Sequence, residues 1–98
     1  MTYEVIFTPG AEADLDEIEQ YLAERFSEAN AQKYIQRIVA HCRALALAPY
    51  RGTKRDDIRP ELRATGFERR VTILFQVETE RVVIFGVFYG GRKFEDVL

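Results

Sequence analysis

The amino-acid sequence predicts an α+β fold with the element order β-α-α-β-β-β. Apolar residues alternate with polar ones near the N-terminus, then recur every three or four positions, and alternate again through the second half of the chain. Two helices joined by a short connection fold back as an antiparallel hairpin, and strands joined by tight turns pair as neighbours. We therefore expect a helical hairpin packed on one face of a mainly antiparallel four-strand sheet.

The first strand and the first helix meet at Thr8 and Pro9. Residues 3–7 alternate with the period of a half-buried strand. Threonine is a favoured N-cap residue, and proline is favoured at the first helical position. Apolar residues then recur at helical spacing and predict one buried stripe. This stripe consists of Leu15, Ile18, Leu22 and Phe26.

Ser27 predicts the start of a second helix, because serine caps helices and Glu28 suits the positive end of the helix dipole. The buried stripe of this helix consists of Ala31, Ile35, Ile38, Cys42 and Leu45. Pro49 is expected to end the helix. Residues 50–61 are polar and rich in turn-forming residues, so we expect an ordered loop there.

Three strand candidates follow at residues 62–68, 70–78 and 81–89, with Thr79 and Glu80 as the turn between the last two. The last candidate is apolar on both faces, which predicts a central strand that is buried on both sides. Regular alternation places two sets of its residues on opposite faces. One set is Val83, Phe85 and Val87, and the other is Val82, Ile84 and Phe88.

One face of the sheet has no covering layer in this expectation. The hairpin covers the other face, and a chain of 98 residues has no spare segment for a third layer. Ile84 and Phe88, or the opposite set, would then form an exposed apolar patch. Such a patch without an internal partner suggests a binding partner outside the chain.

Length, charge and cysteine content limit the class of protein. Residues 1–98 are expected to form a single domain. The net charge is −2 and the pI about 5.4, so no direct sequence-specific DNA binding is expected from this chain alone. The sequence has one cysteine, no signal-peptide pattern and no apolar run long enough for a membrane span. A cytoplasmic location without membrane association is therefore expected.

No metal or cofactor is expected. His41 and Cys42 are the only histidine and cysteine, and adjacent positions on a helix point about 100° apart. The two cannot both face one ion together with further ligands. Cys42 lies in the apolar stripe, which favours core packing, whereas His41 lies off the stripe, which favours a surface position. No nucleophile and base are paired, so a Ser-His-Asp or Cys-His mechanism has no support.

Arginines concentrate near the ends of the predicted meander strands. Arginine binds phosphate and carboxylate groups in a bidentate manner, and a neighbouring tyrosine can stack on a base or donate a proton. The candidate target-binding residues are Arg59, Arg63, Arg69, Arg70, Tyr89, Arg92 and Lys93. The alternative is that these cations pair with nearby carboxylates on an ordinary solvated surface, and the residues alone leave both interpretations open.

Several segments match a known pattern in their order and spacing. They are YEVIFTP at residues 3–9, ADLDEI at 13–18, YL at 21–22, Ala31 with Tyr34 and Ile35, CRAL at 42–45, PYRG at 49–52, DIRPELR at 57–63 and VIFGVFYGGRK at 83–93. Together they resemble the ParE toxins of bacterial type II toxin–antitoxin modules, within the ParE/RelE superfamily. The resemblance covers nearly the whole chain.

The resemblance implies a RelE/ParE-like fold and a toxin that a small ParD-like antitoxin wraps and neutralises in a hetero-oligomer. For the ParE branch, the implied target is DNA gyrase, which the toxin inhibits by binding and without a catalytic residue of its own. Growth arrest and plasmid stabilisation are the implied consequences. The candidate antitoxin contacts are Ile84 and Phe88 on the last strand and Leu22 and Phe26 on the hairpin.

Tyr89 departs from the ParE pattern, in which a histidine usually precedes the final Gly-Arg. A tyrosine near this position serves some ribonucleases of the sister RelE branch, which cleave mRNA on the ribosome. Such an enzyme would use Tyr89 as the acid, Arg63 or Arg69 as the phosphate clamp, and Glu61 or Glu68 as the base. Ribosome-dependent nucleases are usually strongly basic and this chain is acidic, which favours the gyrase inhibitor. A RelE-like endoribonuclease and an inactive complex-forming module remain as alternatives.

Overall fold

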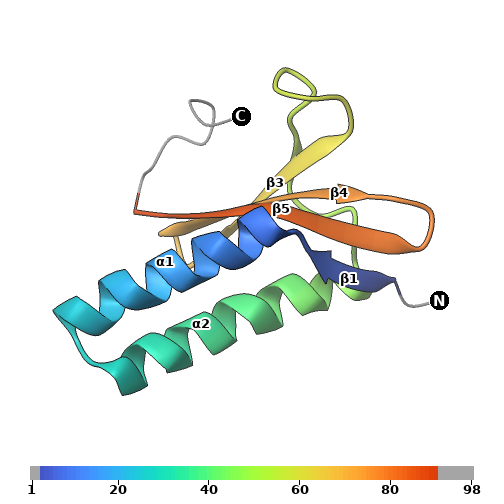
Figure 1. Ribbon diagram of the computed structural model, residues 1–98. Coiled ribbons are helices and arrows are strands. Elements are labelled where there is room, and N and C mark those ends of the chain that lie inside the picture. The colour runs from blue at the N-terminus through green and yellow to red at the C-terminus, as the bar shows by residue number, and fades with distance from the viewer. Residues whose placement is uncertain (1–2, 91–98) are drawn as a thin grey trace.

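The structure has two layers, a five-strand sheet and a helical hairpin that covers one of its faces (Figure 1). It is a computed structural model that describes residues 3–90. The elements are β1 (Glu4–Phe7), α1 (Pro9–Arg25), α2 (Glu28–Arg43), the 3₁₀ turn η1 (Ala44–Ala46), β2 (Thr53–Lys54), β3 (Leu62–Phe67), β4 (Val71–Val77) and β5 (Arg81–Tyr89). The predicted α+β class and the packing of the hairpin on one face are confirmed.

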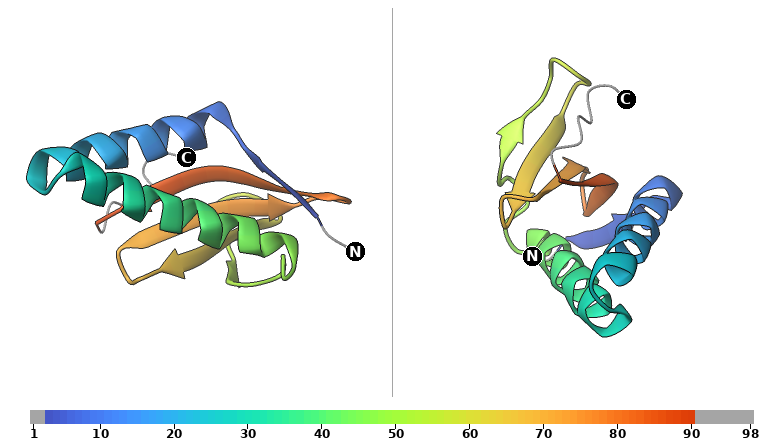
Figure 2. Two further views of the ribbon diagram at one scale, coloured as in Figure 1. Left: turned by 90° about the horizontal axis from the view of Figure 1, so that it is seen from below. Right: turned by 90° about the vertical axis from the view of Figure 1, so that its left-hand side faces the viewer.

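Both helices begin where their capping residues predict. The Thr8 hydroxyl accepts a hydrogen bond from the Ala11 N–H at 3.1 Å, and the Ser27 hydroxyl accepts one from the Asn30 N–H at 3.1 Å. Each bond satisfies an N–H group that the first helical turn leaves without a partner. Because only Phe26 and Ser27 separate the helices, α1 and α2 lie side by side and antiparallel in both views of Figure 2.

The strand order is β1-β5-β4-β3-β2, and only the contact between β1 and β5 is parallel. β4 is the middle strand, and β5 is an interior strand between β1 and β4 that is buried along most of its length, as its two apolar faces predicted. β5 is paired on both sides only over its first half, because β1 pairs only with its residues Arg81 to Ile84. Its second half borders α1 instead.

A fifth strand lies within the segment that was expected to be a loop. Thr53 pairs with Ala64 and Lys54 pairs with Arg63, so β2 adds a short edge to β3. The expected count of four strands is thus corrected to five. A strand of two exposed residues has no apolar alternation, which is why the sequence pattern did not reveal it.

Where β5 pairs with β4 it contains one extra residue, and this residue changes which side chains face the helices. The pairing skips Phe85, since its neighbours Ile84 and Gly86 pair with adjacent residues of β4. An extra residue in a strand reverses the facing of every later side chain. The expectation that Ile84 and Phe88 share a face is therefore wrong: Ile84 lies in the helix-side core with Val87, and Phe88 lies on the opposite face.

The second face of the sheet is covered by the loop between β2 and β3, which we call the strap (residues 55–61). In Figure 1 it lies on the side of the sheet away from the helices. Ile58 of the strap packs against a small cluster of Leu62, Leu74 and Phe88. The expectation of an uncovered apolar face is therefore wrong, and Phe88 is only 7% exposed.

The main core lies between the hairpin and the sheet. Both predicted helical stripes contribute to it, together with inward-facing residues of β4 and β5. Cys42 is fully buried there, and burial raises the pKa of its thiol to about 12. A thiol that stays protonated at neutral pH is a packing group and not a nucleophile.

Candidate binding site at one end of the sheet

The predicted target-binding residues divide between two ends of the sheet. Tyr89 pairs with Val71 of β4, whereas Arg63 pairs with Phe75. These two positions on β4 are four residues apart, which corresponds to about 14 Å along a strand. We call the end with Tyr89 and the β3–β4 turn (residues 68–70) the turn end, and the end where β3 begins the strap end.

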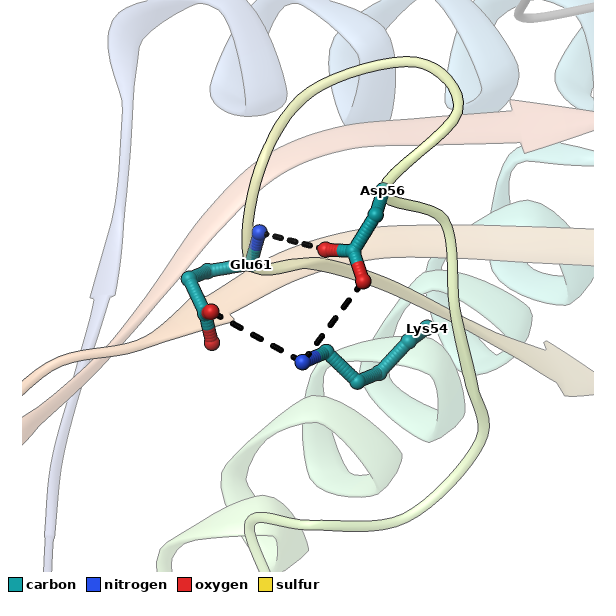
Figure 3. Close-up of polar contacts among 3 residues, drawn as sticks. All are labelled: Lys54, Asp56 and Glu61. Atoms are coloured by element: carbon teal, nitrogen blue, oxygen red, sulfur yellow. Dashed lines mark hydrogen bonds and ion pairs between the residues drawn. The ribbon is translucent and has the colours of Figure 1, made fainter.

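Glu61, at the strap end, is occupied by contacts within the strap. Its backbone N–H donates to the Asp56 carboxylate at 2.8 Å, and its own carboxylate lies 3.7 Å from the Lys54 ammonium (Figure 3). Lys54 also lies 3.6 Å from Asp56. Glu61 has a positive φ of 67°, which the Asp56 bond helps to hold. These contacts close the strap on itself.

Arg63 and Arg59 are also engaged at the strap end. The Arg63 guanidinium donates to the backbone carbonyls of Tyr50 and Arg51 at 3.2 and 3.3 Å and lies over the Tyr50 ring. The Arg59 guanidinium lies 5.1 Å from the centroid of the Phe85 ring. Both arginines thus hold loop segments onto the sheet.

The turn end is built on an unusual turn. Glu68 and Arg69 are its central residues, and both have positive φ, 51° and 64°. The Arg70 N–H closes the turn on the Phe67 carbonyl at 3.3 Å, and the Arg70 carbonyl accepts from the Gly90 N–H at 2.8 Å. Positive φ at two central residues normally calls for Asn-Gly or Asp-Gly, so this turn holds charged side chains at a conformational cost.

Tyr89 extends from β5 into a cluster of aromatic rings beside this turn. Its ring centroid lies 5.9 Å from that of Tyr21 on α1 and 6.0 Å from that of Tyr34 on α2. Arg37 lies over the Tyr34 ring and forms an ion pair with Glu68. Both helices and the turn thus meet at Tyr89.

An open cavity of about 440 Å³ lies between the hairpin and the turn end. Its apolar wall consists of Leu22, Phe26, Ala31, Tyr34 and Tyr89. Its polar rim consists of Asn30, Glu68 and Arg70. We call it the apolar cavity. Phe26 is 71% exposed, which is unusual for a large apolar side chain and leaves part of the predicted helical stripe uncovered.

A second cavity of about 300 Å³ lies on the other side of Tyr89, against α1. Asp14 and Glu17 give it an acidic character, and Ile18 and Tyr21 complete its helical wall. Tyr89 therefore lines both cavities.

Two polar atoms at the turn end are buried without a hydrogen-bond partner among residues 3–90: the hydroxyl of Tyr34 and Nε2 of His41. Burial and the neighbouring Tyr89 raise the pKa of Tyr34, so its hydroxyl stays protonated. Burial, and to a smaller extent Arg51, lowers the pKa of His41. His41 was expected at the surface, but it packs on Phe67.

The predicted antitoxin contacts do not form one surface. Leu22 and Phe26 line the apolar cavity, whereas Ile84 is fully buried in the main core and Phe88 lies under the strap. Among the predicted target-binding residues, Arg92 and Lys93 lie outside the described residues. The sequence pattern did not predict a role for Tyr21 and Tyr34 at this end. The one signal in the sequence that could have indicated this role was their position on the helices, beside the apolar stripes.

The residues proposed for catalysis divide between the two ends of the sheet. Glu61 and Arg63 lie at the strap end, away from Tyr89, whereas Glu68 and Arg69, the alternative base and phosphate clamp, lie at the turn end with it. In the part of the chain that the structure describes, no group of His, Cys, Asp and Glu side chains could hold a metal ion. No helix there is long and apolar enough to cross a membrane.

Comparison with known proteins gives the following similarities. The family model for the ParE toxin of the type II toxin–antitoxin system, parDE, matches residues 5–94. A chain of the chromosomal ParDE toxin–antitoxin system from P. aeruginosa has a TM-score of 0.79 at 24% identity, over 91% of this chain and 97% of that chain. A chain of the toxin–antitoxin complex RelBE2 from Mycobacterium tuberculosis has a TM-score of 0.67 at 17% identity, over 91% and 99%. No curated protein matches the sequence.

The hairpin on a mostly antiparallel sheet is thus a RelE/ParE-like fold. The chain belongs to the ParE toxin family of type II toxin–antitoxin systems.

Proposed function

We propose that this chain is a cytoplasmic toxin that inhibits DNA gyrase by binding it, and that a ParD-like antitoxin neutralises it. Family membership supports the toxin role. The division of the candidate residues supports binding through the turn end, because Arg69 and Arg70 are exposed there beside Tyr89. The observation that carries the proposal is this division of the arginines between the two ends of the sheet. Arg59 and Arg63 at the strap end already hold loop segments, whereas Arg69 and Arg70 at the turn end are exposed.

A supercoiling assay with purified gyrase tests the target. The wild-type protein should inhibit supercoiling or leave cleaved DNA, and adding the antitoxin should restore full supercoiling. Undiminished supercoiling together with uncleaved DNA contradicts the proposal for that gyrase.

The apolar cavity is the proposed contact for the antitoxin on the hairpin. A partner that covers Phe26 removes a large apolar side chain from water, which stabilises the complex. Binding to the native state also raises the melting temperature, so the complex should melt above the free toxin. Phe26→Ser should weaken the complex at least ~10-fold, a loss of about 1.4 kcal/mol. Leu47→Ser is the matched control, since Leu47 is 80% exposed away from the cavity.

One observation supports the ribonuclease as a second candidate. Glu68 and Arg70 line the same cavity as Tyr89, so an acid, a base and a cation do meet there. In a translating-ribosome assay, such an enzyme should cleave mRNA and lose activity with Tyr89→Phe. Absence of cleavage by the intact protein rejects this candidate.

A further inference from the structure

The extra residue in β5 determines where Tyr89 points. Before it, Val82 and Ile84 face the helices; after it, Val87 faces them and Tyr89 packs against the same core. Regular alternation would instead continue from Ile84 to Gly86 and Phe88, and would turn Tyr89 toward the strap side. The position of Tyr89 thus depends on the bulge at Phe85.

Two side chains near the start of α1 bind the backbone on either side of the bulge. The Asp14 carboxylate accepts a hydrogen bond from the Val87 N–H at 3.0 Å. The Thr8 hydroxyl donates to the Phe85 carbonyl at 3.4 Å. β1 does not extend this far, so these helix residues take the place of a neighbouring strand along this part of β5.

Packing alone specifies this register only weakly. β5 is apolar on both faces, so a shift by one residue would still bury apolar side chains on the helix side. Gly86 lets the Phe88 ring pack close to the strand backbone beside the bulge. A Cβ at position 86 would lie only 2.8 Å from that ring. A directed hydrogen bond from the Val87 N–H to the half-buried Asp14 carboxylate supplies the specificity that apolar contacts lack.

We propose that Asp14 is a positioning residue that holds the β5 bulge and thereby directs Tyr89 to the binding site at the turn end. Its importance for binding rests on the proposed function, whereas its effect on the position of Tyr89 does not. Asp14 acts through the Val87 N–H, and Tyr89 is the residue that contacts the partner.

Nuclear magnetic resonance on the labelled free protein tests the structural part. Asp14→Ala should speed hydrogen exchange of the Val87 amide at least ~10-fold relative to the amides of β4. It should also weaken the nuclear Overhauser effects between the Tyr89 and Tyr34 rings. Asp14→Asn retains an oxygen acceptor and should retain both signals. Unchanged exchange and unchanged ring contacts in Asp14→Ala overturn the proposal.

A measurement on the wild-type protein keeps the test independent of variant folding. Because the Val87 N–H donates to the Asp14 carboxylate, the Val87 amide proton shift should follow the titration of Asp14. A Val87 shift that stays constant while the Asp14 carboxyl titrates overturns the proposal.

A double-mutant comparison tests whether Asp14 acts through Tyr89. Asp14→Ala should weaken gyrase inhibition at least ~10-fold in the wild-type background but less than ~2-fold in the Tyr89→Ala background. Equal losses in both backgrounds overturn the positioning role. If the wild-type protein leaves gyrase unaffected, the proposed function fails while the resonance measurements still decide the role of Asp14.

Discussion

Tyr89 contacts one tyrosine from each helix, and these contacts give the residue a structural role in addition to the binding role that we propose for it. Tyr21 and Tyr34 hold its ring at tilted and edge-on angles, which are favourable aromatic geometries. The Tyr34 hydroxyl is buried and protonated beside it. The effect of Tyr89→Ala should therefore be compared with that of Tyr89→Phe, which keeps the ring contacts and removes only the hydroxyl.

His41 makes the stability of the protein sensitive to acid. Burial lowers its pKa in the folded state, so the unfolded chain binds the proton more readily. The free energy of unfolding should therefore fall as the pH drops below the ordinary histidine pKa of about 6.5. His41→Phe should remove this component and keep the ring contact with Phe67.

Denaturant unfolding at about pH 7.5 and about pH 5.5 measures this effect. The wild-type protein should lose more stability between the two conditions than His41→Phe does. An equal loss in both proteins would show that His41 does not contribute.

The β3–β4 turn carries charged side chains in a backbone conformation that lowers the stability of the fold. Placing Glu68 and Arg69 in the left-handed region costs each residue of the order of 1 kcal/mol. The paired change Glu68→Asn and Arg69→Gly should raise the free energy of unfolding by about 1 kcal/mol. This net gain already includes the small loss from removing the exposed ion pair between Glu68 and Arg37. It should also weaken target binding, because the cation at Arg69 is lost.

The β4–β5 turn provides the matched control. Thr79 and Glu80 are not among the described residues with positive φ, so Asn and Gly there relieve no strain. Denaturant unfolding of the two paired variants should show a gain only for the β3–β4 turn. Equal changes in both variants would argue against stored strain at Glu68 and Arg69.

The strap covers the second face of the sheet through one apolar side chain. Ile58 is half-buried against Leu62, Leu74 and Phe88, so Ile58→Ala should lower the free energy of unfolding by about 1–2 kcal/mol. The uncovered face should also bind more of a hydrophobic dye. Leu47→Ala is the control and should change stability by less than about 0.5 kcal/mol, because Leu47 is 80% exposed. Similar losses in both variants would contradict the covering role.

The molecule as a whole shows what local patterns can predict. The helix caps at Thr8 and Ser27 and the two apolar stripes were predictable, because capping and helical periodicity act over a few residues. The bulge at Phe85 was not, since a strand that is apolar on both faces looks the same in either register. Ile58 alone did not indicate a covering strap within a polar loop.

The candidate site was predictable only in part for the same reason. Arg69, Arg70 and Tyr89 were grouped by residue type and lie at one end of the sheet, but Arg59 and Arg63 were grouped with them although they lie at the other end. Strand register determines this separation, and register depends on contacts between residues far apart in the chain.

Gyrase supercoiling, titrated with matched arginine variants, tests the central claim that the turn end binds the target. The paired variant Arg69→Ala and Arg70→Ala should require at least ~10-fold more protein than the wild type for equal inhibition. Arg59→Ala at the strap end should stay within ~2-fold of the wild type, since a rim or structural contact contributes little to binding. Equal losses at both ends, or no inhibition by the wild-type protein, would contradict the account.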